Sequence, residues 1–273
     1  MIEQEVSPYK TKIDSGNAYW MARLASLAYR CKSESDPFPN EEEILENLRK
    51  DDIEFLTVKG FNINSAQAVI IEHNNYICFA FRGTDELVDW LDNADIRSEK
   101  QLFGKFHKGF WNSTLDLWDS MWKHYKKLLS QKKRPLFLTG HSLGGALATI
   151  ATAKLVYDDL PFTSVYTFGQ PRAVDRTACR ILNTEAKERY FRFQNNNDIV
   201  TRVPPRLAGF SHVGTYLYIS EEKTIHTDPG FWFKFLDAVD GVVSDLANFG
   251  IDGIKDHNMD LYLKAVQKWK FKG

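Results

Sequence analysis

The hydrophobic and polar positions of the chain follow two periods, which predict helices and strands in alternation. In several segments apolar residues recur every three or four positions, as expected of helices that bury one face. The segment 41–50 also carries acidic side chains at its amino end, where they interact favourably with the helix dipole. We therefore predict helices over residues 17–30, 41–50, 109–130, 231–249 and 258–269.

Short apolar runs between these segments predict strands. The runs 66–73 and 76–83 are separated by Asn74 and Asn75, a pair typical of a hairpin turn. Four later runs are apolar on both faces, as in central strands covered by helices; they span residues 135–140, 164–169, 190–194 and 215–220. The alternation, without a linker or an internal repeat, predicts one α/β domain with a mixed, mostly parallel central sheet flanked by helices.

Composition and charge narrow the classes of function. The net charge of −1 gives no overall field that would attract nucleic acid or an anionic membrane. The three cysteines, Cys31, Cys78 and Cys179, fit no metal or disulfide spacing. No run of about 18 apolar residues predicts a membrane span, and the chain does not start with a signal peptide. We expect a soluble protein, secreted if a leader has been removed, and the sequence does not specify its oligomeric state or compartment.

The segment Gly140-His141-Ser142-Leu143-Gly144 fits the pattern G-x-S-x-G. An apolar strand precedes it and an alanine-rich helix follows it, which is the context of a nucleophile elbow. In such a turn the serine Oγ projects beyond the sheet, and glycines two positions away let strand and helix approach closely. The Leu143 backbone N–H, at the start of the helix, would point toward an oxyanion. The alternative is a glycine-rich turn with a surface serine.

A nucleophilic serine needs a base, and the base needs an acid that orients it. Downstream acids after strands include Asp175, whose simpler role is at a helix start, and Asp198, at the carboxyl end of a strand. The downstream histidines are His212, His226 and His257. The position of His257 after the last strand favours it as the base, but residue type and order leave all three open.

Several segments together resemble the class 3 lipases, the fungal-type triacylglycerol lipase branch of the α/β-hydrolases. They occur in the family's order between residues 79 and 263: FAFRGTDELVDWLDNADI, FHKGFWNS, LTGHSLGGALA, YTFGQPRAVD, NNNDIVTRVPP, FSHVG and DHNMDLYL. The resemblance implies an α/β-hydrolase fold, with residues 1–273 as a single domain and a short lid near residues 85–95.

The resemblance also assigns roles by position. It makes Ser142 the nucleophile, Asp198 the acid and His257 the base, and it excludes His141 and His212 as the base. Thr84, in FRGTD, matches the first oxyanion residue, and Leu143 matches the second. No metal or organic cofactor is required. Lid and acyl-site candidates from the segment 86–92 are Leu87, Val88, Trp90 and Leu91, which could equally pack against the core.

The function implied is carboxylic ester hydrolysis through an acyl-enzyme, most simply by a triacylglycerol lipase or esterase. The partner would be a lipid or other ester substrate, and exposed apolar lid residues could contact a lipid–water interface. Phospholipase A1 and feruloyl-type esterase are alternatives, and only the substrate groove would distinguish them from a triacylglycerol lipase. Two further readings are acyl transfer to an alcohol or thiol and an inactive lipase-like scaffold that binds a partner.

Overall fold

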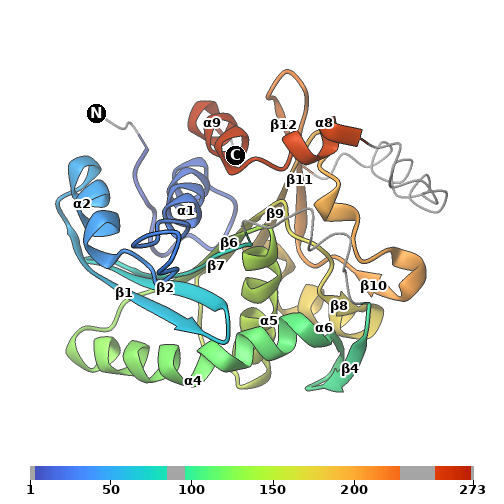
Figure 1. Ribbon diagram of the computed structural model, residues 1–273, viewed down its shortest axis with the longest axis horizontal. Coiled ribbons are helices and arrows are strands. Elements are labelled where there is room, and N and C mark those ends of the chain that lie inside the picture. The colour runs from blue at the N-terminus through green and yellow to red at the C-terminus, as the bar shows by residue number, and fades with distance from the viewer. Residues whose placement is uncertain (1–3, 85–95, 228–249, 272–273) are drawn as a thin grey trace.

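The centre of the fold is an eight-stranded sheet. A computed structural model describes residues 4–84, 96–227 and 250–271 (Figure 1). Strand order is β1-β2-β3-β6-β7-β9-β11-β12, with parallel pairing from β3 to β11 and antiparallel pairing at both edges. The strands are β1 (Phe55–Ile63), β2 (Ala66–His73), β3 (Ile77–Phe81), β6 (Leu136–His141), β7 (Ser164–Phe168), β9 (Tyr190–Asn195), β11 (Thr215–Ile219) and β12 (Ile225–Thr227). This confirms the predicted mixed sheet and the hairpin of β2 and β3.

Helices cover both faces of this sheet (Figure 1). On one face lie α4 (Lys108–Gln131), α5 (Leu143–Tyr157) and α6 (Arg176–Ala186), whose apolar residues share one core cluster with β2, β3 and β6. On the other face lie α1 (Ser15–Leu27), α2 (Glu41–Asp51) and α9 (Met259–Lys268), which form a second cluster. The sheet therefore has two buried faces, which explains why its central strands are apolar throughout.

Local capping fixes where several helices begin. The Asp14 side chain accepts a hydrogen bond from Asn17 N at the start of α1, and Asn40 accepts one from Glu43 N at the start of α2. Asp175 does the same for α6, accepting from Ala178 N at 2.8 Å. The helix-start role expected for Asp175 is thus confirmed.

A second, smaller sheet was not predicted. It joins β10 (Phe210–Ser211), β8 (Val174–Asp175), β5 (Gly104–His107) and β4 (Ser98–Gln101) by antiparallel pairing. In Figure 1 it lies at the right of the main sheet, beside α6. The edge strands β1 and β12 were also missed. The helix predicted over residues 231–249 lies outside the described residues.

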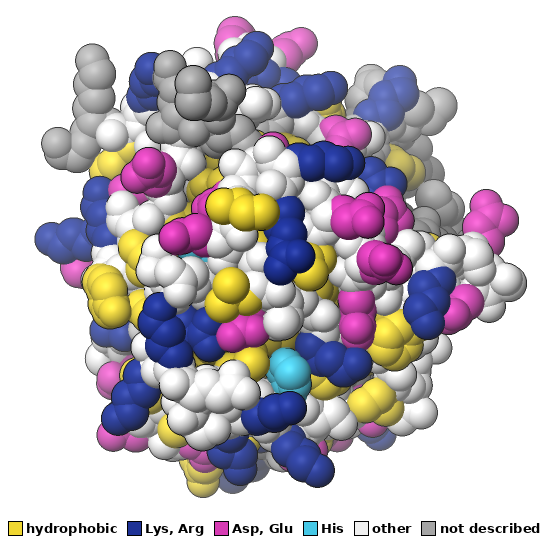
Figure 2. All heavy atoms as spheres, turned by 90° about the vertical axis from the view of Figure 1, so that its left-hand side faces the viewer, with side chains coloured by type: hydrophobic (Ala, Val, Ile, Leu, Met, Phe, Trp, Pro, Cys, Tyr) yellow, Lys and Arg dark blue, Asp and Glu magenta, His cyan; other side chains and the backbone are white. Residues whose placement is uncertain are grey.

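Shorter helical elements lie in the connections between the longer ones. They are α8 (Gly250–Lys255) and the 3₁₀ turns η1 (Lys187–Arg189), η2 (Val200–Arg202) and η3 (Arg206–Ala208). Within the described part of the chain, no helix is both long and apolar enough to cross a membrane. The face in Figure 2 mixes acidic and basic side chains without a patch of one sign, as expected from the small net charge.

Candidate active site

Ser142 occupies the sharp turn between β6 and α5. Its backbone has φ 57° and ψ −132°, a conformation that a non-glycine residue adopts only under strain. The turn is fixed on both sides, because Ser142 N donates to Phe168 O on β7 and Gly145 N donates to Ser142 O, both at 2.9 Å. This geometry is the strand-to-helix elbow predicted from the sequence.

Two glycines make the elbow sterically possible. A Cβ on Gly140 would lie 2.3 Å from Gly144 C, and a Cβ on Gly144 would lie 2.1 Å from Phe81 O on β3. No side chain fits at either position, so the helix can start directly against the sheet only with glycine there. The close approach of strand and helix that the motif predicts is therefore present.

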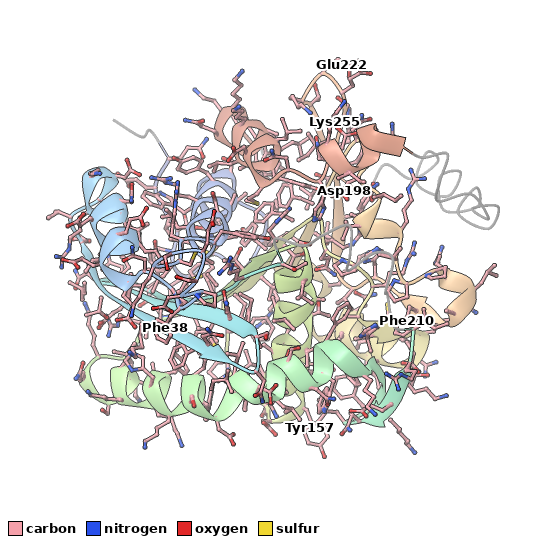
Figure 3. All side chains as sticks on the ribbon, in the orientation of Figure 1. Phe38, Tyr157, Asp198, Phe210, Glu222 and Lys255 are labelled. Carbon is pink, nitrogen blue, oxygen red and sulfur yellow. The ribbon has the colours of Figure 1, made fainter. Side chains whose placement is uncertain are left out.

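The structure brings Asp198 and His257 into direct contact above the sheet. Asp198 follows the end of β9 and is fully buried, and its Oδ2 lies 2.8 Å from His257 Nδ1. Because an ionised carboxylate only accepts hydrogen bonds, His257 Nδ1 is the donor and His257 Nε2 carries the lone pair. Asp198 lies just below α8 in Figure 3, near Lys255.

The loop that carries His257 is tied to the end of β9. Asp256 accepts from Asn196 Nδ2 at 3.0 Å and from Asn197 N at 3.1 Å, and Asn195 Nδ2 donates to Asp256 O at 2.8 Å. These contacts join segments about sixty residues apart in the sequence. They set the position of His257 against Asp198, because Asp198 directly follows one of the two bonded segments and His257 directly follows the other.

Tyr262 supports the same pair from α9. Its hydroxyl donates to Asp198 Oδ2 at 2.5 Å and accepts from Asn195 N at 2.9 Å. Burial raises the pKa of Tyr262 well above its ordinary value, and the charge of Asp198 raises it further. The hydroxyl therefore stays protonated and remains a donor to the carboxylate over the whole neutral range.

His141 precedes the serine but is engaged elsewhere. His141 Nε2 lies 2.7 Å from His257 O, and since a carbonyl only accepts, this nitrogen carries the proton. His141 Nδ1 then accepts from the Tyr29 hydroxyl at 2.8 Å. Burial lowers the pKa of His141 well below its ordinary value, with the nearby His257 adding to the effect. His141 is a neutral support for His257, with neither nitrogen available to Ser142.

Ser142 lies close to the contact between Asp198 and His257. The His141 and His257 rings are 4.4 Å apart between centroids, and Ser142 directly follows His141. Gly169, next to the Phe168 carbonyl that binds Ser142 N, lies against both Asp198 and His257. Ser142 Oγ and His257 Nε2 are buried and have no hydrogen-bond partner among residues 4–84, 96–227 and 250–271. Each is thus available to a reacting group, and such contacts often tighten only when substrate is bound.

Thr84 and Leu143 lie on the same side of the elbow. Both line a depression of about 330 Å³ that also includes Gly83, Arg82 and Leu147. A Cβ on Gly83 would lie 3.0 Å from Ser142 Cβ, so the chain leading to Thr84 passes directly beside the serine. Leu143 is the first residue of α5, where a backbone N–H has no intrahelical acceptor. Thr84 and Leu143 thus line the same depression, and their role as a pair of oxyanion donors stays a prediction.

The other candidates are placed elsewhere. His212 Nε2 donates to Thr201 O at 2.7 Å, and burial together with Arg192 and Arg172 lowers the pKa of His212 well below its ordinary value. His226 is exposed on β12. The lid and acyl-site candidates Leu87, Val88, Trp90 and Leu91 lie outside the described residues. Across the described ranges, no group of three or more His, Cys, Asp or Glu side chains could hold a metal ion.

Sequence reasoning gave no role to Tyr262, Asp256 or Tyr29. Tyr262 lies five residues after His257 within the DHNMDLYL segment, so its presence in that pattern was a usable signal. Asp256 immediately precedes His257, and the run Asn195 to Asn197 precedes Asp198. The contact between these two polar segments could not be read from either one alone.

Comparisons with known proteins find similarity to lipases. The family model described as Lipase (class 3) matches residues 78–208. A secreted mono- and diacylglycerol lipase A of Penicillium cyclopium is 27% identical over 194 residues, covering 68% of this chain and 61% of the relative. A lipase of Rhizomucor miehei is 33% identical over 161 residues, covering 54% of this chain and 42% of the relative. The chain thus spans about three fifths, or less, of these curated relatives.

Solved structures show the same fold. The structure of the Rhizomucor miehei triacylglyceride lipase superposes with a TM-score of 0.67 and 20% identity, covering 89% of this chain and 94% of that one. This likeness, together with the parallel centre of the sheet and helices on both faces, shows an α/β-hydrolase fold.

Proposed function

Because residues 78–208 match the family model described as Lipase (class 3), we propose that the protein is a serine hydrolase that cleaves the carboxylic esters of acylglycerols. One observation supports this most directly. His257 Nδ1 is held by Asp198, while His257 Nε2 and Ser142 Oγ are both buried and have no hydrogen-bond partner among the described residues. The names of the relatives, which are mono-, di- and triacylglycerol lipases, support the choice of substrate.

Acylation starts with attack of Ser142 Oγ on the ester carbonyl carbon. His257 Nε2 takes the serine proton, and the imidazolium that forms is stabilised by Asp198 through the Nδ1–H bond. The carbonyl oxygen becomes an oxyanion, which is stabilised by the backbone N–H groups of Leu143, at the start of α5, and of Thr84, after β3. The alcohol then leaves with the proton that His257 returns to it.

Deacylation repeats these steps with water as the nucleophile. His257 removes a proton from water, which attacks the acyl-serine carbonyl, and Ser142 leaves as the alcohol after protonation by His257. The Tyr262 hydroxyl remains bonded to Asp198 throughout and keeps the carboxylate oriented. In this reaction every proton is transferred through His257, and water supplies the hydroxyl group of the released acid.

The test compares wild-type protein with Ser142→Ala on 4-nitrophenyl esters of increasing chain length and on emulsified triacylglycerol. We expect Ser142→Ala to lower kcat by at least about 10⁴-fold, as loss of a nucleophile does in other triads. Ser130→Ala, at the far end of α4, is the matched control and should retain full activity.

A second readout identifies the nucleophile directly. A fluorophosphonate should label the peptide that contains Ser142 in wild-type protein, and no label should appear in Ser142→Ala. Wild-type hydrolysis no faster than that of Ser142→Ala, with no labelled peptide, would overturn the proposal. If the protein hydrolysed short esters but no acylglycerols, the mechanism would be retained and the substrate class would be rejected.

A further inference from the structure

An exposed leucine projects from the turn formed by residues 205–209, between η2 and β10. Leu207 is 85% exposed, the highest value among the large hydrophobic side chains of the described residues. Every residue of this turn is exposed, from Pro205 to Gly209. An isolated exposed leucine is common on proteins, so its meaning depends on how it is presented and on its neighbours.

The turn that carries Leu207 is held at both ends. Arg172 N donates to Val203 O at 2.8 Å before the turn, and Ala208 N donates to Pro205 O at 3.0 Å within it. After the turn Phe210 is buried and belongs to β10 of the small sheet. Leu207 is therefore displayed on an ordered support, so that binding through it does not require the backbone to become ordered first.

Three cationic side chains lie in the same depression as the leucine. Lys105, Arg176 and Arg206 line the same depression as Leu207. Asp175 is the one carboxylate among the described residues in that lining, and its Oδ1 already caps α6 by accepting from Ala178 N. Neither Lys105 nor Arg176 forms an ion pair with a described residue. Among the described residues of this lining, three cationic side chains therefore face one carboxylate, although the net charge of the chain is −1.

We propose that this turn, residues 205–209, is a docking point for an anionic lipid surface. Leu207 enters the interfacial region of the lipid, and Lys105, Arg176 and Arg206 contact its anionic headgroups. A single exposed apolar side chain that shares a depression with three cations suits insertion into an anionic interface, where burial and charge attraction act together. A protein partner would need a far larger complementary area.

The chain also provides a matched control. Ile53 is 76% exposed, but it lies between the carboxylates Asp52 and Glu54 rather than among cations. It belongs to the connection from α2 to β1, at the left of Figure 1, whereas β10 lies at the right. Phe210, at the base of the docking turn, is labelled on the right of Figure 3. The two exposed side chains differ mainly in the charges around them.

The experiment measures sedimentation of the full chain with phosphatidylcholine vesicles, with and without phosphatidylglycerol. All variants are made in the Ser142→Ala background, so binding is scored without hydrolysis and independently of the proposed function. We expect binding to phosphatidylglycerol vesicles that weakens with salt. Leu207→Ser should lower the partition coefficient about tenfold, and Arg176→Gln about fivefold on anionic vesicles only. Ile53→Ser should match the parent.

Thermal unfolding and hydrolysis of a soluble short ester, measured with Ser142 restored, verify that the variants fold. Three results would each overturn the proposal: no binding of the parent to anionic vesicles, equal binding to neutral and anionic vesicles, or equal losses from Leu207→Ser and Ile53→Ser. The last result would mean that any exposed apolar side chain contributes equally.

Discussion

At the scale of single residues, Asp198 shows how the site holds a buried charge. Its Oδ1 accepts from Val200 N at 2.9 Å, and its Oδ2 accepts from both His257 Nδ1 and the Tyr262 hydroxyl. The side chain is fully buried, so these three donors replace the water that a carboxylate would otherwise bind. The position of His257 therefore depends on the contacts that hold Asp198 as well as on the contacts that His257 itself makes.

Replacement of Tyr262 by phenylalanine should slow hydrolysis by roughly tenfold in kcat, with little change in KM, because a hydrogen bond to a buried charge is lost. Steady-state kinetics with a soluble short ester measure kcat and KM.

Tyr125→Phe is the control for this variant. Tyr125 is buried in the core on the opposite face of the sheet, packed against Phe79 and Trp122, so loss of its hydroxyl should leave kcat and KM unchanged. A Tyr262→Phe enzyme with wild-type kinetics would show that the Asp198 contact does not position His257.

The candidate triad could be proposed from sequence because each member lies in a short segment that resembles the class 3 lipases, whereas residue type and order alone left three histidines open. Ser142 has its glycines, Asp198 follows a strand, and His257 precedes a helix. The residues that hold them could not be proposed, since Tyr29 reaches His141 across 112 positions and Asp256 reaches Asn196 across 60. Such contacts depend on how distant loops meet, which no local pattern encodes.

At the scale of elements, the junction of β6 and α5 is the most constrained feature. α5 is buried along almost its whole length, consistent with its alanine, glycine and threonine content. The helix starts within contact distance of the β3 backbone, because Gly144 lies against Phe81 O. Any added atom at that contact has to move β3, β6 or α5.

Gly144→Ala should therefore lower the free energy of unfolding by about 1–3 kcal/mol or more, because the new Cβ would lie 2.1 Å from Phe81 O. Urea denaturation measures the change. Gly109→Ala in the first turn of α4 is the comparison, since its Cβ would have the His107 ring as its nearest neighbour at 3.3 Å. That variant should stay within about 1 kcal/mol of wild type. Equal effects at both positions would contradict the steric account.

Element prediction succeeded where burial is uniform and failed where it is not. The central strands β6, β7 and β9 are buried at every residue and were predicted as apolar runs. The strands β8 and β10 have two residues each, too few to show a period. The strand β4 is a polar SEKQ segment without buried residues, and only its pairing with β5 makes it a strand.

At the scale of the whole molecule, both core clusters contain buried tyrosines. Burial raises the pKa of Tyr125 and of Tyr190 to about 12. It also raises the pKa of Tyr76, Tyr166 and Tyr262. In the unfolded chain a tyrosine loses its proton near pH 10. The folded state therefore keeps protons that the unfolded state releases, and stability becomes dependent on pH in the alkaline range.

The sign of this dependence is fixed. Below pH 10 a buried tyrosine is protonated in both states and its contribution is complete, while between pH 10 and 12 stability falls by about 1.4 kcal/mol per pH unit for each such group.

Tyr125→Phe should reduce the slope of unfolding free energy against pH by that amount, because the Tyr125 hydroxyl has no hydrogen bond to a described residue. Tyr9→Phe, at a side chain that is 82% exposed, should leave the slope unchanged. Urea titrations at about pH 8, 10 and 11 measure the slopes, because this range spans the pH of about 10 at which free tyrosine ionises. Identical slopes for wild type and Tyr125→Phe would show that tyrosine ionisation does not limit alkaline stability.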